Sequence, residues 1–170
     1  MPVKRGAGGK LQNYDSHGRY AKTNYSFLYE VKPSRKEKAR RKEEARRDAL
    51  YHRAKNSKDP YLLEVFLAIE KEMPGEVTGV NEIRFDPNIG HPREFDILTK
   101  KCIIEVKGKQ VRRKLTQLLQ QKEYAISKGK KYIVFAPNIL FPCKNDYENH
   151  GIKITTSISD MLKEIKEGKK

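Results

Sequence analysis

Two acidic residues and a lysine lie in two short apolar segments that follow one another closely. Asp96 lies in the segment 93–98, and Glu105 and Lys107 close the segment 102–107. Both segments are rich in β-branched and aromatic residues, and the turn-like residues 99–101 separate them, so they are predicted to form a hairpin. Strand alternation places Glu105 and Lys107 on the same face. The two acids and the lysine are therefore expected to meet at the ends of neighbouring strands.

Two carboxylates at one point suit a hard divalent cation. Magnesium prefers oxygen ligands and takes only one or two protein carboxylates, which Asp96 and Glu105 would supply. A lysine beside them can orient or help deprotonate an attacking water, or neutralise charge that develops on a phosphate. The chemistry that fits this set is phosphodiester hydrolysis. The alternative is a solvated strand face on which Glu105 and Lys107 form an incidental ion pair.

The order of these residues resembles the PD-(D/E)XK nuclease superfamily. The match spans roughly residues 60–157 and consists of an acid, a second acid two residues before a lysine, and a following helix: Asp96, Glu105, Val106, Lys107 and the residues from about 110. Phe95 stands where the family pattern has proline. The match is closest to domains of bacterial toxins and phage-associated proteins. The resemblance implies a restriction-endonuclease-like α/β fold, in which helices flank a mixed β-sheet.

The resemblance also implies roles for these residues. Asp96 and Glu105 would bind Mg²⁺ or Mn²⁺, with the main-chain carbonyl of Val106 as a further ligand, and Lys107 would be the catalytic lysine. Members of the superfamily often add a glutamate from the helix before the sheet. Residues 61–70 carry apolar side chains at helical spacing, so they are predicted to form that helix, and Glu64 is the candidate. A surface acid explains Glu64 equally well.

The helix predicted after Lys107 has one apolar stripe and one polar stripe, and the polar stripe includes Gln117 and Gln121. Relatives with this helix often place a glutamine or a lysine near the metal. The resemblance therefore makes Gln117 the first further site candidate and Gln121 the second. Any amphipathic helix also carries glutamines on its surface, so this alternative stays open.

The balance of charge is strongly basic. The 170 residues include 37 Lys and Arg against 22 Asp and Glu, a net charge of +15. Such a surface favours a polyanionic partner, because Lys and Arg release counterions from phosphates. Nucleic acid is the expected partner, with DNA favoured over RNA. No apolar run reaches the length of a membrane span and no secretory signal opens the chain, so a cytoplasmic protein is expected, or one delivered into a target cell if it is a toxin.

Zinc is not expected. The two cysteines do not form a Cys-x-x-Cys pair, the four histidines are scattered without ligand spacing, and Cys143 is predicted to lie in a loop after Phe141 and Pro142.

Two regions are predicted: a basic N-terminal extension, residues 1–57, and a nuclease domain, residues 58–170. The extension begins with an arm rich in Gly, Lys, Asn, Tyr and Ser. Ser34 can cap a helix that extends to Ser57, and residues 35–55 hold ten Lys or Arg and four Asp or Glu. We interpret this helix as an electrostatic grip on the phosphate backbone, although most such charge runs are solvated faces. Further strands are predicted at 81–85, 131–136 and 152–155, with a closing helix around 159–165.

The sequence thus predicts a magnesium-dependent endonuclease that hydrolyses DNA. If it is a toxin or a phage-associated nuclease, an inhibitor protein is a further expected partner. One alternative is a noncatalytic basic module that binds nucleic acid, for which the charge alone suffices. Another is an RNase that cleaves RNA, including tRNA, with the same site.

Overall fold

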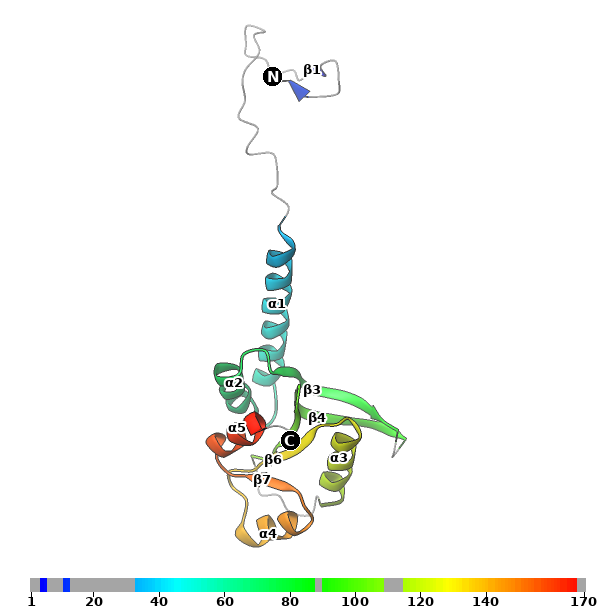
Figure 1. The fold of residues 1–170 in the computed structure, drawn as a ribbon, viewed down its shortest axis with the longest axis vertical. Coiled ribbons are helices and arrows are strands. Elements are labelled where there is room, and N and C mark those ends of the chain that lie inside the picture. The colour runs from blue at the N-terminus through cyan, green and yellow to red at the C-terminus, as the bar shows by residue number, and fades with distance from the viewer. Residues whose placement is uncertain (1–3, 6–10, 13–32, 88–89, 109–114, 168–170) are drawn as a thin grey trace. The chain divides into compact units, whose positions relative to one another are not determined.

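The computed structural model describes residues 4–5, 11–12, 33–87, 90–108 and 115–167 (Figure 1). The chain divides into two compact units, Met1–Arg41 and Lys42–Lys170. In the first unit, β1 (Lys4–Arg5) pairs antiparallel with β2 (Leu11–Gln12). Helix α1 (Arg35–Lys55) begins there, and Ser34 Oγ accepts a hydrogen bond of 3.1 Å from the Glu37 N–H. The cap predicted at Ser34 is confirmed. Most of the predicted arm lies outside the described residues.

A five-stranded mixed sheet forms the centre of the second unit. Its strands lie in chain order: β3 (Val77–Asp86), β4 (His91–Thr99), β5 (Cys102–Val106), β6 (Lys131–Phe135) and β7 (Lys153–Thr155). The first three strands are antiparallel, and β5, β6 and β7 are parallel. The predicted α/β class and the predicted hairpin of β4 and β5 are confirmed. Parallel strands are buried on both faces, and β5 is buried along its whole length.

Helices cover both faces of the sheet (Figure 1). Helix α2 (Leu62–Glu72), helix α5 (Ile158–Glu167) and the last turns of α1 share one hydrophobic core with the sheet. Helix α3 (Leu115–Ser127) and helix α4 (Phe141–Asn149) share a second core on the other face. Alternation in β5 explains the division, because Cys102, Ile104 and Val106 face the first core and Ile103 faces the second. Glu105 therefore points toward the side of α3.

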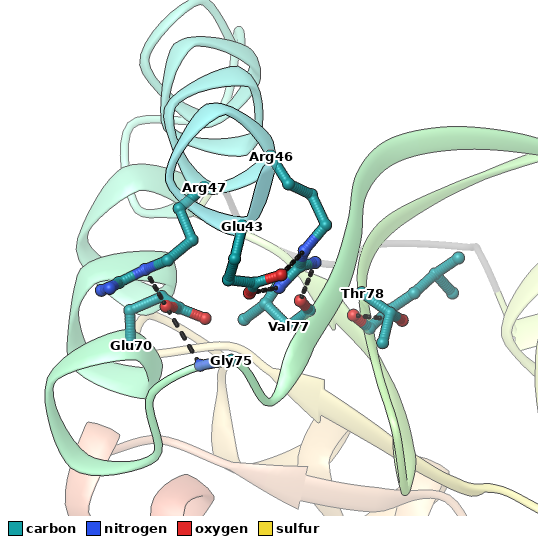
Figure 2. Close-up of polar contacts among 8 residues, drawn as sticks. Glu43, Arg46, Arg47, Glu70, Gly75, Val77 and Thr78 are labelled. Atoms are coloured by element: carbon teal, nitrogen blue, oxygen red, sulfur yellow. Dashed lines mark hydrogen bonds and ion pairs between the residues drawn. The ribbon is translucent and has the colours of Figure 1, made fainter. Parts of the chain in front are cut away.

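The second half of α1 belongs to the second compact unit. Leu50 and Ala54 are buried in the first core. Figure 2 shows Arg46 Nη1 donating a hydrogen bond of 2.8 Å to the Val77 carbonyl oxygen while its guanidinium pairs with Glu43. The second compact unit begins at Lys42 and includes this part of α1, whereas the sequence predicts a boundary between residues 57 and 58.

A second arginine holds α1 against α2. Arg47 Nε lies 3.0 Å from Glu70 Oε2, and the same oxygen accepts a hydrogen bond of 3.3 Å from the Gly75 N–H (Figure 2). Glu70 is buried, so its charge requires these partners. Two of the ten basic residues of α1 therefore have structural roles.

Helix α4 differs from the loop predicted around Cys143. Residues 141–149 are helical, with Pro142 in the first turn, where a missing N–H has no intrahelical partner to lose. Tyr147 is the buried residue of this helix. The segment has little amphipathic pattern, which explains why the sequence did not predict it. Within the described ranges, no helix is both long enough and apolar enough to cross a membrane.

Candidate functional site

The end of the β4–β5 ladder brings Asp96 to the Glu105–Lys107 segment. Main-chain pairing joins Ile97 to Ile104 and Leu98 to Ile103. Beside these pairs, Asp96 Oδ2 accepts a hydrogen bond of 2.7 Å from the Val106 N–H. The side chain of the first acid is thus fixed against the main chain between the second acid and the lysine.

Strand β4 changes face at Asp96. Ile97 packs in the first core and Phe95 in the second, although residues two apart in a strand ordinarily share a face. The pairing partners of these two residues in β3 flank Asn81, which has a positive φ of 47°. Asparagine tolerates this left-handed conformation better than most residues. The hairpin is therefore irregular where Asn81 and Asp96 lie on its two strands.

Glu105 is held on both of its carboxylate oxygens. It is 2% exposed, and its Oε1 forms an ion pair with Lys107 Nζ. Its Oε2 accepts a hydrogen bond of 3.0 Å from Gln121 Nε2. Gln121 Oε1 in turn accepts a hydrogen bond of 2.9 Å from the hydroxyl of Tyr132. A buried chain of polar groups from β6 through α3 thus orients the second acid.

The carboxyl group of Asp96 has a strongly altered acidity. Burial raises its pKa to about 7, and the negative charges of Glu105 and Asp59 act in the same direction. The charge of Lys107 and the hydrogen bond from the Val106 N–H act in the opposite direction and are outweighed. The fold therefore holds acids close together that repel one another when ionised, and a bound cation would relieve that repulsion.

Lys107 is held in its charged form. Burial lowers the pKa of the ammonium group, but the charges of Glu105 and Asp96 and the hydrogen bond to Glu105 together raise the pKa above its ordinary value. At neutral pH this lysine is an ammonium ion next to the two acids Glu105 and Asp96. It can neutralise negative charge or orient a ligand, but without a change in its surroundings it cannot accept a proton.

The chain directly after Lys107 is clamped by three side chains. Asp59 Oδ2 accepts a hydrogen bond of 2.9 Å from the Gly108 N–H, and Asn138 Nδ2 donates one of 3.1 Å to the Gly108 carbonyl. The ring of Tyr61 lies so close that a Cβ on Gly108 would stand 2.7 Å from Tyr61 Cδ2. The close approach requires glycine at this position and fixes the end of the segment that carries Lys107.

The donor set fits a hard divalent cation. Two carboxylates, Asp96 and Glu105, match the number that magnesium takes from protein, and their mutual repulsion favours a cation between them. The described part of the chain contains no cluster of three or more His, Cys, Asp or Glu side chains placed to hold a metal ion. A cation here would therefore keep much of its coordination as water or substrate oxygen. The carbonyl of Val106 stays a predicted ligand.

The predicted site residues divide into two groups. Asp96, Glu105, Val106 and Lys107 lie together, as the sequence predicts. Glu64 is an exposed residue in the first turn of α2, and Gln117 is a partly buried residue of α3. Among the described residues, neither of them forms a hydrogen bond or ion pair with Asp96 or Glu105. The first residues predicted for the helix after Lys107, 110–114, lie outside the described residues.

Gln121 contacts Glu105, whereas the sequence analysis ranked Gln117 first. Both residues lie on the polar stripe of α3, one turn apart. The sequence does not indicate a role for Tyr132 in the site, because this residue lies in an apolar strand and has the pattern of a core residue. It also does not identify Asp59. Asp59 precedes α2, and its Oδ1 accepts a hydrogen bond of 2.9 Å from the Tyr61 N–H. An aspartate in this position indicates the start of a helix, but it does not predict the contact with Gly108.

No protein-family model matches this chain, no curated protein matches its sequence, and no solved structure matches its fold.

Proposed function

We propose that this protein is a metal-dependent nuclease of the PD-(D/E)XK type, which hydrolyses phosphodiester bonds with DNA as the favoured substrate. The observation that carries the proposal is the convergence of Asp96, Glu105 and Lys107 where β4 meets β5. Burial and like charge raise the pKa of Asp96 to about 7. A carboxyl group perturbed in this way beside a second acid is typical of functional sites, although structural ion pairs perturb pKa values as well.

The architecture is compatible with this assignment. A mixed sheet with helices on both faces is the arrangement that the resemblance implies. The two acids lie on an antiparallel pair of strands, and the next strand joins β5 in parallel after a helical crossover. The sheet therefore provides a rigid support for the acids, while α3 supplies Gln121 from the side.

Each residue has a role that its contacts allow. Asp96 and Glu105 would hold the divalent cation, which when bound supplies Lewis acidity and acidifies a water molecule. Lys107, held as an ammonium ion, would neutralise charge on the phosphate that is attacked. Gln121 and Tyr132 position Glu105, so that its carboxylate cannot rotate away from Lys107. Asp59 and Asn138 hold the main chain at Gly108.

The charge distribution supports a nucleic-acid substrate. Residues 35–41 hold five Lys or Arg and one Glu, which pairs with Arg41, and in the later turns of α1 Arg46 and Arg47 pair with acids. Basic residues bind phosphates without regard to sequence, so this charge supports affinity rather than specificity.

Cleavage assays on three substrates test the proposal and identify the substrate class. Plasmid DNA, single-stranded DNA and total RNA are each incubated with Mg²⁺, Mn²⁺ or EDTA. Wild type is compared with Glu105→Gln and with Glu123→Gln, which removes an exposed acid of α3 as a matched control. Metal-dependent cutting that Glu105→Gln loses and Glu123→Gln keeps supports the nuclease. Cutting of RNA alone indicates the RNase, and binding without cutting by any of the three proteins indicates a noncatalytic module.

A further inference from the structure

The outer part of the hairpin formed by β3 and β4 projects beyond the rest of the sheet (Figure 1). In the described part of the chain, β3 is an edge strand, because only β4 pairs with it. The ribbon is held near its turn, since Arg93 forms an ion pair with the buried Asp86, the last residue of β3, and donates a hydrogen bond to Gln120 of α3. The edge of β3 is thus presented on a fixed support.

On one face of this ribbon, strand β3 exposes apolar side chains beside the exposed Glu94, which pairs with Ile83. Ile83 is 70% exposed and Phe85 is 62% exposed, and strand alternation puts them on the same face. Pro92, which pairs with Phe85 across the ribbon, is also exposed. Contiguous exposed apolar side chains on a strand that has a free edge are typical of an interaction surface.

The two edges of the sheet differ in their protection. Strand β7 has three residues and begins with Lys153, features that discourage pairing with another chain. Strand β3 has ten residues and no lysine. Its first residue, Val77, is covered by Arg46 of α1, and Asn81 interrupts the extended conformation with its positive φ. The segment from residue 82 to residue 86 is therefore the part of this edge that can accept another strand.

The charges of this segment are self-complementary. Glu82 and Arg84 flank Ile83, lie on the face opposite to Ile83 and Phe85, and form an ion pair with one another. Glu82 also lies 3.9 Å from Arg53 of α1. If a second β3 pairs antiparallel with the first and the two Ile83 residues stand opposite one another, each Glu82 faces Arg84 of the second copy. In this register residues 82–84 of the two copies pair directly and the two Ile83 side chains meet. Each Phe85 then lies diagonal to Ile83 of the other copy and opposite its Asn81. Opposite charges and apolar pairs across strands stabilise such pairing.

We propose that the protein forms a symmetric dimer in which the β3 edges of two copies pair antiparallel about Ile83. The interface is isologous, because the same residues contribute from each copy. It is small, so the dimer forms at micromolar rather than nanomolar concentrations. This inference does not depend on the proposed nuclease activity. If both are correct, the dimer carries two sites and can act on two strands of a duplex.

Sedimentation velocity on the full chain tests the proposal, at concentrations from roughly 1 to 100 μM and in enough salt to screen the net charge. We expect a concentration-dependent dimer for wild type. Arg84→Glu puts like charges opposite one another twice and is expected to raise the dissociation constant at least about tenfold. Glu82→Arg combined with Arg84→Glu restores opposite charges and is expected to recover the dimer to within about threefold of wild type.

Two further variants distinguish pairing through β3 from association through net charge or through another surface. Lys163→Glu on α5 changes the net charge by the same amount as Arg84→Glu and is expected to leave the dimer intact. Phe85→Ser, checked for folding by circular dichroism, is expected to give monomers. A wild-type protein that is monomeric over the whole range overturns the proposal. So does a dimer that Arg84→Glu leaves unchanged, or one that the double exchange does not restore.

Discussion

Asp96 is the acid whose charged form the fold disfavours most clearly. Its pKa is about 7 in the folded protein against an ordinary value of 3.8, because burial and the neighbouring acids disfavour the carboxylate. A structural ion pair would ordinarily lower the pKa of an acid. The Asp96 carboxylate therefore does not stabilise the metal-free fold, which is consistent with the proposed cation site.

This pKa predicts how stability depends on pH. Between about pH 4 and pH 7 the folded state binds a proton that the unfolded state has lost, so the free energy of unfolding falls as pH rises. The contribution is fully present below about pH 4 and is lost as pH passes 7. Asp96→Asn should remove this dependence and stabilise the metal-free protein at pH 8 by about 1 to 3 kcal/mol. Urea unfolding in EDTA at pH 5 and pH 8 measures it.

The same shift with pH in wild type and Asp96→Asn would contradict this prediction. Lys163→Gln, which changes a lysine of α5, is the control for general effects of charge. It should follow the wild-type dependence on pH, because Lys163 is not part of the Asp96 surroundings.

Gln117 and Gln121 lie one turn apart on α3 and give a second prediction. Of these two glutamines, Gln121 is the one that donates a hydrogen bond to Glu105 among the described residues. Gln121→Ala leaves the Glu105 carboxylate and the Tyr132 hydroxyl without their buried partner, which should cost about 1 to 3 kcal/mol of stability. It should also reduce cleavage. Gln117→Ala should change stability by less than about 0.5 kcal/mol. Equal effects of the two substitutions on unfolding and cleavage would contradict the assigned role of Gln121.

Among the structural elements, the end of β5 depends on a loop that is distant in sequence. Asp59 precedes α2 and binds the Gly108 N–H 49 residues later, while Tyr61 packs on Gly108 and forms an edge-to-face contact with Phe135. The loop before α2 thus fixes the direction in which the chain leaves the sheet after Lys107. The site is formed by packing between elements as well as by the hairpin itself.

Gly108→Ala tests this packing. The added Cβ would stand 2.7 Å from Tyr61 Cδ2 and 2.9 Å from Asp59 Oδ1, so either the ring or the chain must move. We expect a loss of stability of about 1 to 3 kcal/mol and a larger loss of cleavage than stability explains. Asn138→Ala, which removes one exposed hydrogen bond at the same residue, should cost about 1 kcal/mol or less. Thermal unfolding and cleavage rates that match wild type in Gly108→Ala would show that the clamp is not required.

The sequence predicted the elements better than their mutual placement. Alternation in residues 102–107 was sufficient to put Glu105 opposite the first core, because a strand has only two faces. Helical spacing put Gln117 and Gln121 on one stripe but could not determine which turn meets the sheet, because that depends on the position of α3 along its axis. The contact of Asp59 with Gly108 is long-range and leaves no periodic signal. The sequence does not predict helix α4, because its residues are mostly polar and give no clear apolar stripe at helical spacing.

At the scale of the whole molecule, the most basic part of the chain and the candidate site lie in different parts of the sequence. Residues 1–41 hold 11 of the 37 Lys and Arg and 3 of the 22 Asp and Glu, a net of +8 in the part of the chain outside the second compact unit. The candidate site lies entirely in residues 59–138. Affinity for a polyanion and hydrolysis are therefore expected to be separable by truncation.

Two truncations test this separation. Removal of residues 1–41 should leave a folded protein that still cleaves but binds nucleic acid with a shallower dependence on salt, because fewer counterions are released. Removal of residues 1–57 should destabilise the fold, because it takes Leu50 and Ala54 from the core and leaves the buried Glu70 without Arg47. Circular dichroism and salt-dependent binding measure both effects. A shorter truncation that unfolds, or a longer one that is fully stable, would contradict the domain boundary at residue 42.

We propose that Asp96, Glu105 and Lys107 form a metal-dependent phosphodiesterase site. The most direct measurement is the rate of nucleic-acid cleavage in Mg²⁺ and in EDTA for wild type, Lys107→Gln and Lys163→Gln. We predict cleavage by wild type and Lys163→Gln in Mg²⁺, none in EDTA, and a rate at least about 100-fold lower for folded Lys107→Gln. Cleavage that persists at the wild-type rate in folded Lys107→Gln, or that does not need the cation, would contradict the claim.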